Sequence, residues 1–420
     1  MNPIELEEYT TRTVTLDRGI ADAIIAAGIV TIVGGHRAGQ WQLTSKGKVG
    51  TLTIRAAGGR SVTLVLKPRI PVHRLLFLIG YVHDPKGWRE ETAPVGTEAD
   101  LVSVMAVLFE RYASKALRQG TLVPGYRTVD DSGTVIRGRV RQADQIRRHL
   151  GSALPVETTR DDLSENVPVN RILRTACDRL RELPDILPAR TRKGLNRIGA
   201  KLEHVAPLGR GEAPPKWRRT RANKHWQETL GIADLVLRNA SVERVRDARD
   251  TVTISGFVFQ MSTVFQDFIA VALREELRVR GVHCRFAPKD RYHLDDHGHV
   301  PVQPDFVGCD SGEVPLCVAD VKYKPKEHPQ SDAYQMLAYC VGLGLSEGHL
   351  IYPRGEQLPQ TFTVSRADIV IHHHAIDLDQ PRVDLLAQIG ELAERLLGIP
   401  GAEPVAPQAA VADGRSAADR

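Results

Sequence analysis

The segment from Val302 to Tyr339 constrains the fold of this chain most, because its pattern fits few arrangements of strands and helices. Apolar residues predict one strand over Val302–Val307 and a second over Pro315–Tyr323. Asp310-Ser311-Gly312 lies between them and is typical of a tight turn. The segment therefore predicts a hairpin of two short strands, the second of them largely buried.

Two carboxylates and one lysine fall within these strands. Successive side chains of a strand point to opposite faces, so Asp320 and Lys322 share one face, and a hairpin can bring Asp305 beside Asp320. Two carboxylates on neighbouring strands suit Mg²⁺, with water and a substrate phosphate completing its coordination. Such an ion activates water and polarises a phosphoryl group, while Lys322 can orient the nucleophile. The alternative interpretation of Asp-x-Lys is a surface ion pair on an exposed strand.

Helical patterns flank the two strands. Upstream, apolar residues between Met261 and Ala272 repeat at helical spacing. Downstream, a helix is predicted over Ser331–Gly342, with Gln335 and Tyr339 one turn apart. The PD-(D/E)xK nuclease core has the same order of elements: a helix, a strand with Asp, a strand with Asp-x-Lys and a second helix. The leading prediction is therefore a metal-dependent nuclease.

Turn-rich and low-hydrophobicity segments divide the rest of the chain. We expect a β-rich N-terminal domain over residues 1–90, which includes a hairpin over Gly50–Ile70. A mainly helical middle region follows over 98–250, and the nuclease domain covers 252–398. The tail 399–420 has almost nothing to bury and is predicted to be disordered. The expected architecture is thus a multidomain α+β or α/β protein with a restriction-endonuclease-like C-terminal core.

Several classes of protein are excluded by what the chain lacks. No clean apolar run is longer than Ala23–Val33, which is too short to span a membrane, and the first residues do not resemble a secretory signal. The five cysteines form no CxxC pair, so we expect a reduced, cytoplasmic chain. Gly34–Gly39 has the glycine spacing of a phosphate loop, but Gln40-Trp41 replaces the required Lys-Ser/Thr, which excludes a P-loop NTPase. Histidines 372–374 would alternate between the faces of a strand and so cannot close on one metal.

Basic residues concentrate between residues 210 and 225. Trp217 and Trp226 are interleaved with or adjacent to them. Basic side chains neutralise phosphates and indoles stack on bases, so this basic segment is a candidate DNA-binding site. A solvated loop after Pro214-Pro215 is an equally good interpretation. The candidate DNA-binding residues are Lys216, Arg218, Arg219, Arg221 and Lys224.

Nearly the whole chain, apart from the basic segment and the tail, resembles the McrC family, the nuclease subunit of modification-dependent McrBC restriction systems. The similar segments follow in family order: Lys67-Pro68-Arg69-Ile70, Gly125-Tyr126, Ile136-Arg137-Gly138-Arg139-Val140, Ser164-Glu165-Asn166, Asn170-Arg171-Ile172-Leu173, Phe257 to Phe268, Pro304-Asp305, Asp320-Val321-Lys322-Tyr323-Lys324 and Tyr334-Gln335-Met336. Each segment alone is weak, and their combination is specific.

The resemblance implies roles for individual residues. Asp305 and Asp320 would bind Mg²⁺, for which Mn²⁺ can substitute, and Lys322 would be the catalytic lysine. Gln335 would be an auxiliary polar residue on the following helix, although a structural role is an equally good interpretation. The family usually has Glu in the first nuclease helix where this chain has Gln266 and then Asp267. Helical phase leaves open which of those two approaches the site.

The resemblance also implies a partner, a hexameric McrB-like AAA+ GTPase that recognises modified DNA, such as DNA containing methylcytosine. The amino-terminal part of a McrC-like protein inserts into the ring and stimulates GTP hydrolysis, and Arg137, Arg139 and Arg141 are candidates for that contact. A solvated strand edge is the alternative for these arginines. We therefore expect a Mg²⁺-dependent DNA endonuclease subunit. The alternatives are a catalytically decayed regulator of a ring NTPase, suggested by Gln266, and a basic scaffold that only binds nucleic acid.

Overall fold

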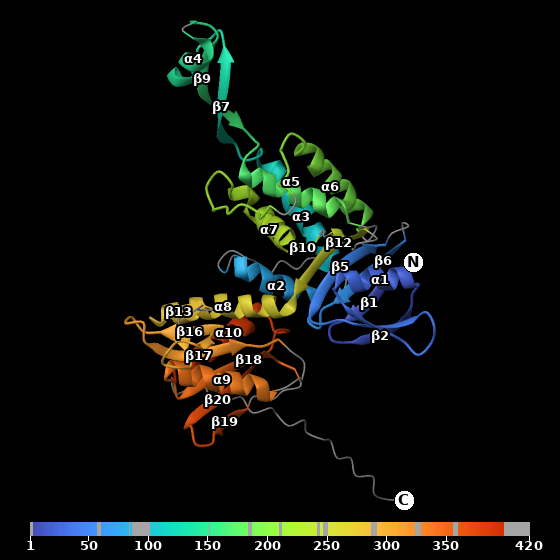
Figure 1. Cartoon of the computed structure of the whole chain (residues 1–420), viewed down its shortest axis with the longest axis vertical. Helices are drawn as coiled ribbons and strands as arrows, with labels where there is room; N and C mark the ends of the chain where they lie inside the picture. Colours follow the sequence, from blue (N-terminus) through green and yellow to red (C-terminus); the bar gives the residue numbers. More distant parts are fainter. Residues whose placement is uncertain are drawn as a thin grey trace, which may run out of the picture. The chain divides into compact units, whose positions relative to one another are not determined.

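A computed structural model of the chain comprises two compact units, Met1–Val264 (unit 1) and Phe265–Arg420 (unit 2) (Figure 1). The structure describes residues 3–56, 60–83, 85, 101–150, 152–183, 187–209, 212–241, 244–246, 251–286, 292–323, 329–355 and 360–398. The tail 399–420 and Arg210 therefore lie outside the described residues. Within the described part of the chain, no helix has both the length and the hydropathy needed to cross a membrane.

The main sheet of unit 1 combines both ends of that unit's sequence. Its strands are β1 (Ile4–Glu7), β6 (Ser61–Lys67), β5 (Lys48–Arg55), β12 (Thr251–Gln260) and β10 (Ala240–Ser241), in that order, with β11 (Arg244–Arg246) also paired to β12. β5 and β6 form the expected antiparallel hairpin, whose Gly58-Gly59 turn lies outside the described residues. Helix α1 (Arg18–Ala27) packs Ile20 and Ile24 against this sheet. A second sheet contains β2 (Thr11–Thr15), β4 (Gln40–Thr44) and β3 (Thr31–Gly34).

Strand β12 belongs to this sheet by its pairing, although the C-terminal domain was predicted to begin at residue 252. It runs antiparallel to β5, with Phe257 opposite Thr51. The two strands approach closely at Gly50, where φ is 137° and an added Cβ would lie 2.0 Å from the carbonyl oxygen of Phe257. The partner of β12 is some two hundred residues away in sequence, so hydrophobic patterning could not reveal the pairing.

Several helices of unit 1, other than α1 and the helix of residues 142–149, pack around a core of their own. They are α2 (Val72–His83), α3 (Leu101–Gln119), α5 (Pro168–Arg181), α6 (Ala189–Lys201), the short 3₁₀ helix η1 (Lys224–Trp226) and α7 (Gln227–Asn239). Phe109, Leu173, Leu195 and Trp226 are fully buried. The Trp226 indole N–H donates to the carbonyl of Thr121 at 3.1 Å. The suggestion that Trp226 stacks on bases is therefore wrong, because its ring is a core side chain.

The middle region also contains a three-stranded sheet, although it was predicted to be mainly helical. Strands β7 (Gly125–Gly133), β9 (Val156–Ser164) and β8 (Arg139–Val140), with helix α4 (Gln142–His149), form an extension of unit 1 that we call the stalk, residues 125–164 (Figure 1). Cross-strand hydrogen bonds connect Thr128 to Asp161 and Thr159 to Asp130, both at 2.7 Å. These strands are rich in Thr and Asp and carry little apolar alternation, which is the pattern that reveals strands in sequence.

Unit 2 is built on a mixed six-stranded sheet. Its strands are β13 (His283–Phe286), β16 (Phe306–Cys309), β17 (Pro315–Val321), β18 (Glu347–Pro353), β20 (Ile369–Ile376) and β19 (Thr361–Val364), in that order. β17, β18 and β20 are parallel, whereas β16 and β17 form an antiparallel hairpin. The helices are α8 (Met261–Val279), which begins in unit 1, α9 (Pro329–Leu343) and α10 (Arg382–Leu396), and β14 (Tyr292–His293) pairs with β15 (Pro301–Val302). Met336 and Cys340 of α9 pack on Val307, Val318 and Leu350 of the sheet.

Candidate active site

The β16–β17 hairpin brings Asp305 and Asp320 together, as its sequence predicted. Phe306 pairs with Ala319, so the residues just beyond this pair, Asp305 and Asp320, lie at the same end of neighbouring strands. Asp305 itself lies in a bend before β16, and the single strand predicted over 302–307 is divided into β15 and β16. Pro304 explains the division, because proline has no N–H to donate to a sheet.

Both oxygens of the Asp305 carboxylate accept hydrogen bonds. The backbone N–H of Val321 donates to Oδ2 at 2.9 Å, and the side-chain amide of Gln266 on α8 donates to Oδ1. Burial, together with the negative charge of Asp320, raises the pKa of Asp305 to about 6. Two acidic groups therefore share a partly desolvated site whose negative charge favours a bound cation.

Lys322 lies between Asp320 and the helix that follows. Its Nζ is 2.5 Å from Oδ2 of Asp320 and donates to Oε1 of Gln335 on α9 at 2.9 Å. Asp320 is 2% exposed, and the Lys322 side chain is 16% exposed. The alternative of an ion pair on an exposed strand is therefore wrong, since both charged groups are largely removed from water.

A chain of hydrogen bonds joins Lys322 to the segment that carries Asp305. The Gln335 amide contacts the Tyr339 hydroxyl at 2.6 Å, and this hydroxyl donates to the carbonyl of Gln303 at 2.9 Å. Burial, and then the nearby carboxylates, raise the pKa of Tyr339, so its hydroxyl keeps its proton at neutral pH. Sequence reasoning gave Tyr339 and Gln303 no role, although the one-turn spacing of Gln335 and Tyr339 was visible.

The structure decides which α8 residue approaches the carboxylates. Gln266 is half-buried and contacts Asp305, whereas Asp267 is exposed. Asp267 therefore does not replace the missing acid at this site. The neutral amide orients Asp305 and adds no negative charge.

These donors suit a hard divalent cation. Asp305 and Asp320 offer carboxylate oxygens, the ligands that Mg²⁺ prefers, and the mutual repulsion of the two charges would be relieved by a cation. Within the described residues, no group of three or more His, Cys, Asp or Glu side chains could hold a metal ion. A magnesium ion at this site would therefore need water and substrate oxygens to complete its coordination.

The histidine triplet on β20 is divided between the faces of its sheet. The ring of His374 contacts that of His349 on β18 at 3.0 Å, and His372 also stacks on His349. His373 instead contacts Tyr352 and Phe362. The three rings therefore do not converge on one point.

The other predicted residues lie in unit 1, on the stalk and in the basic segment. Arg137 and Arg139 are exposed, whereas Arg141 forms ion pairs with Asp130 at 3.1 Å and with Asp144. The basic residues predicted to bind DNA are all exposed, and Trp217 is half-buried. These basic residues are Lys216, Arg218, Arg219, Arg221 and Lys224.

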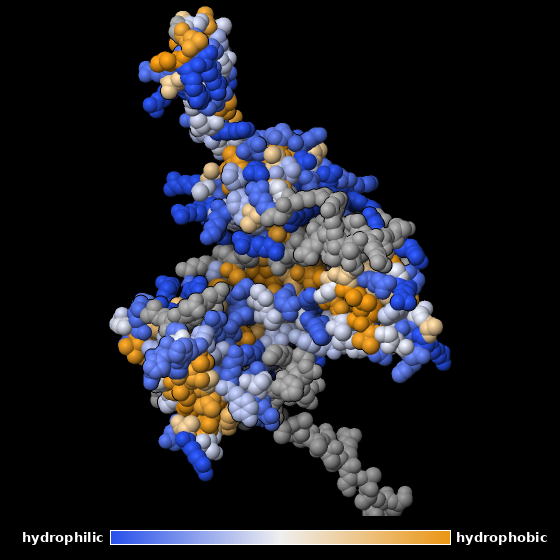
Figure 2. All heavy atoms as spheres, in the orientation of Figure 1, coloured by the Kyte–Doolittle hydropathy of each residue, from blue (hydrophilic) through white to orange (hydrophobic). Residues whose placement is uncertain are grey.

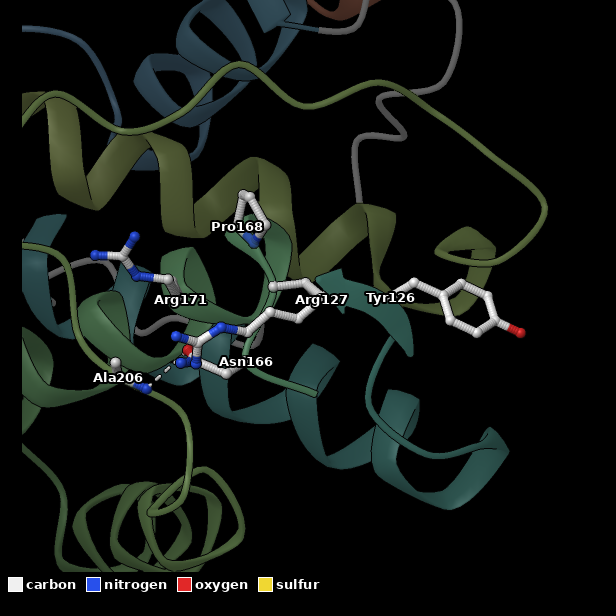
Figure 3. A pocket seen from close by; sticks show the side chains of 7 residues that line it. Tyr126, Arg127, Asn166, Pro168, Arg171 and Ala206 are labelled. Atoms are coloured by element: carbon white, nitrogen blue, oxygen red, sulfur yellow. Dashed lines mark hydrogen bonds between the residues drawn. The ribbon is translucent and has the colours of Figure 1, made fainter. Parts of the chain in front are cut away.

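A separate cavity of about 410 Å³ lies where the stalk joins the helices of unit 1 (Figure 3). Figure 3 shows the Arg127 side chain extending toward Asn166, whose Oδ1 accepts the backbone N–H of Ala206 at 3.1 Å, while Tyr126 points away. Arg171 also lines the cavity but is engaged with the Pro207 carbonyl and Glu212. None of the predicted site residues lines this cavity.

Comparison with known proteins agrees with this fold. The family model of the McrBC 5-methylcytosine restriction system component matches residues 53–353. A chain in the half-complex from a tetradecameric assembly of Thermococcus gammatolerans McrB AAA+ hexamers with bound McrC is similar, with a TM-score of 0.58 and 16% identity over 94% of this chain and 100% of that chain. A chain in the cryo-EM structure of the Thermococcus gammatolerans McrBC complex matches with a TM-score of 0.41 and 16% identity over 66% of this chain and 88% of that one. No curated protein matches the sequence significantly.

The family match covers well over half of the 420 residues and includes both Asp305 and Asp320. The first of the two structural likenesses supports the mixed α/β fold over nearly the whole chain. The chain therefore belongs to the family of McrBC 5-methylcytosine restriction system components.

Proposed function

We propose that this chain is the Mg²⁺-dependent DNA endonuclease subunit of a McrBC-like restriction system, with a PD-(D/E)xK core in unit 2. The observation that carries the proposal is the buried cluster of Asp305, Asp320 and Lys322 at the end of the β16–β17 hairpin. The substrate would be DNA that contains methylcytosine, in keeping with the description of the family.

Each polar group of the cluster has a distinct task in phosphodiester hydrolysis. The Val321 N–H and Gln266 fix both oxygens of Asp305, so this carboxylate is oriented before substrate binds. Gln335 holds the Lys322 ammonium, which can orient the attacking water and offset negative charge that develops on the phosphate. Tyr339 fixes the segment before Asp305 through the Gln303 carbonyl.

Asp305 and Asp320 are the residues that would hold Mg²⁺, with Mn²⁺ as a substitute. A bound ion would polarise the phosphoryl group, make a bound water more acidic and stabilise the leaving oxygen. Two carboxylates and one lysine leave a net negative charge for a cation to neutralise, which supports this assignment.

We further propose that the stalk contacts a McrB-like AAA+ GTPase hexamer and stimulates it. Val135, Ile136, Ile146 and Leu150 are large apolar side chains exposed toward the end of the stalk, and Figure 2 shows hydrophobic surface there. Exposed apolar side chains that gather in one place mark interaction surfaces. Arg137 and Arg139 lie on or beside this surface without an ion pair among the described residues, whereas Arg141 is held within the stalk. Arg137 and Arg139 are therefore better candidates for stimulation than Arg141.

Cleavage of plasmid DNA tests the nuclease proposal. Methylated and unmethylated plasmid would be incubated with Mg²⁺, with the chain alone or with its McrB-like partner and GTP. Asp320→Asn and Lys322→Gln should each reduce cleavage by about a hundredfold or more, because each removes a charge that the reaction uses. Asp267→Asn is the matched control, since it neutralises an exposed carboxylate of α8 outside the cluster and should leave cleavage unchanged.

One observation favours a second candidate, a non-nucleolytic regulator of the ring NTPase. Gln266 contributes no negative charge beside Asp305, so the site has fewer acidic ligands than the family pattern implies. The regulator would accelerate GTP hydrolysis by the partner without cleaving either plasmid, and Asp320→Asn would not alter that acceleration. Cleavage that depends on Asp320 and Lys322 would exclude it.

A further inference from the structure

Helix α6 in unit 1 carries only basic residues among its charged side chains. The helix has the sequence ARTRKGLNRIGAK and contains no aspartate or glutamate. Figure 2 shows hydrophilic surface over the region of α6 that Figure 1 labels. The basic residues are Arg190, Arg192, Lys193, Arg197 and Lys201.

Four of these cations form one stripe. Arg190, Lys193, Arg197 and Lys201 follow one another at intervals of three, four and four residues, which is the spacing of one face of an α-helix. All four are exposed. With a rise of about 1.5 Å per residue, the stripe is roughly 16 Å long. We call these four residues the α6 stripe.

The α6 stripe differs from the other basic helices by having no acidic partner. On α5, α7 and α10, arginines are paired with acids one turn away, as in the pairs Arg174–Asp178, Arg238–Asp234 and Arg395–Glu391. Within the part of the chain that the structure describes, no ion pair or hydrogen bond involves a side chain of the α6 stripe. Four neighbouring cations repel one another, so this arrangement weakens the helix slightly and is relieved by an external anion.

Close packing beside and behind the stripe fixes the direction in which it points. Leu195 and Ile198 are buried, and an added Cβ on Gly194, at the edge of the stripe, would lie 2.4 Å from Oε1 of Glu110 on α3. An added Cβ on Gly199 would lie 2.7 Å from Nη1 of Arg181 on α5. The helix therefore packs close to two neighbours, and it cannot rotate to bury its cations without disrupting that packing.

We propose that the α6 stripe binds the phosphate backbone of duplex DNA without regard to sequence or methylation. A strand of duplex DNA carries one phosphate per about 3.4 Å of helix axis, so a stripe of this length can reach several phosphates. Protein–protein interfaces have apolar cores that are depleted of charge, and the exposed face of α6 offers no large apolar residue for such a core. This proposal goes beyond the proposed nuclease function, because binding of the DNA backbone by the α6 stripe requires neither a metal ion nor cleavage.

Binding of duplex DNA in the absence of divalent metal tests the α6 stripe. The full chain with Arg190→Gln, Lys193→Gln, Arg197→Gln and Lys201→Gln would be compared with wild type by fluorescence anisotropy between about 50 and 200 mM salt. We expect affinity to fall at least about tenfold at 150 mM salt. The slope of log K against log salt should become shallower by about 0.9 for each phosphate that the variant no longer neutralises. Glutamine favours helix, and circular dichroism would verify that the fold is retained.

A matched control distinguishes the effect of the α6 stripe on DNA affinity from the effect of net charge. The control has Arg18→Gln, Arg37→Gln, Lys46→Gln and Arg55→Gln, four exposed cations of unit 1 whose replacement removes the same charge. It should keep at least most of the wild-type affinity. The inference fails if the stripe variant binds like wild type, or if both variants bind DNA equally weakly. It also fails if the stripe variant retains DNA binding but no longer binds the GTPase, since the stripe would then recognise an acidic protein surface. Binding is measured without divalent metal and requires no cleavage, so a chain that binds DNA through the α6 stripe but cleaves no plasmid would contradict the nuclease proposal alone.

Discussion

Unit 2 contains a buried histidine pair that should make its stability depend on pH. His349 on β18 and His374 on β20 lie within 3.0 Å through Nδ1 and Nε2, and their residues are only 2% and 7% exposed. Burial lowers the pKa of His374 to about 3 and that of His349 well below its usual value, with neighbouring charges adding to both shifts. The other groups that act on the pair are Arg395, His372 and His373 at His374, and His372 at His349. Both histidines are therefore neutral in the folded protein over the physiological range.

The size of this loss of stability follows from the difference in histidine pKa between the folded and unfolded states. Unfolded histidine has a pKa of about 6.5, so below that pH the unfolded chain binds protons that the folded chain cannot. Stability is therefore full above about pH 6.5 and falls as the pH decreases toward the folded pKa. At pH 5 the loss is about 2 kcal/mol for one histidine and about 4 kcal/mol for both. This result hardly depends on the folded pKa values, provided that they lie well below 5.

Hydrogen exchange of the β18 and β20 amides is the appropriate assay. All four tryptophans of the chain belong to unit 1, so fluorescence would not report on unit 2. The opening free energy of peptides from both strands would be measured at pH 7 and 5, after correction for intrinsic exchange. A double variant, His349→Leu with His374→Leu, removes both polar partners and should have near wild-type stability at pH 7, with a much smaller loss at pH 5. The single variant His374→Leu leaves the His349 nitrogen unpaired and should cost about 1–3 kcal/mol at pH 7. An equal loss between pH 7 and 5 in wild type and the double variant would refute the assignment to these histidines.

Two further predictions concern unit 1. Asn170 is fully buried, donates to the carbonyls of Val123 and Glu165 at 2.9 and 2.7 Å, and accepts from the Val123 N–H, so it connects α5 to the segments just before and just after the stalk. Asn170→Ala should lower the free energy of unfolding by about 3 kcal/mol in urea titrations followed by tryptophan fluorescence, and equal stability of variant and wild type would contradict this role. Gly50→Ala places a Cβ against the Phe257 carbonyl at a positive φ and should cost about 3 kcal/mol or more, with faster exchange of the β5 and β12 amides. Unchanged exchange of those amides would show that β5 and β12 accommodate the added Cβ without a loss of stability.

The local geometry of the candidate site could be predicted, because it depends on a short hairpin. The turn at Asp310 and the alternation along β17 determine both the strand register and the face of Asp320 and Lys322. The contact between Lys322 and Gln335 could not be derived, since it depends on how α9 packs on the sheet. The choice between Gln266 and Asp267 also depends on packing, because helical phase places both at the edge of the apolar stripe of α8.

Pairing between distant segments was beyond sequence reasoning. Strand β12 looks like the beginning of the C-terminal domain, and only its register with β5 shows that it completes the sheet of unit 1. The stalk strands were missed for a different reason. Their cross-strand contacts are polar, so the strands lack the apolar alternation by which strands are recognised. Trp226 shows a third limit, because an aromatic residue beside basic residues has the same sequence pattern whether its ring is buried or exposed.

The energetic cost of the Asp320–Lys322 pair favours the nuclease proposal over the decayed regulator. A buried ion pair contributes little or no stability compared with apolar residues of similar volume, because both charges must be removed from water. Here the second carboxylate, Asp305, is itself partly buried and is repelled by Asp320, and both effects raise its pKa. Stability alone therefore gives no reason for these three charged residues to occupy the end of the hairpin. A chain without nuclease chemistry could replace them with apolar side chains and gain stability, whereas a chain that must bind a cation and a phosphate needs all three.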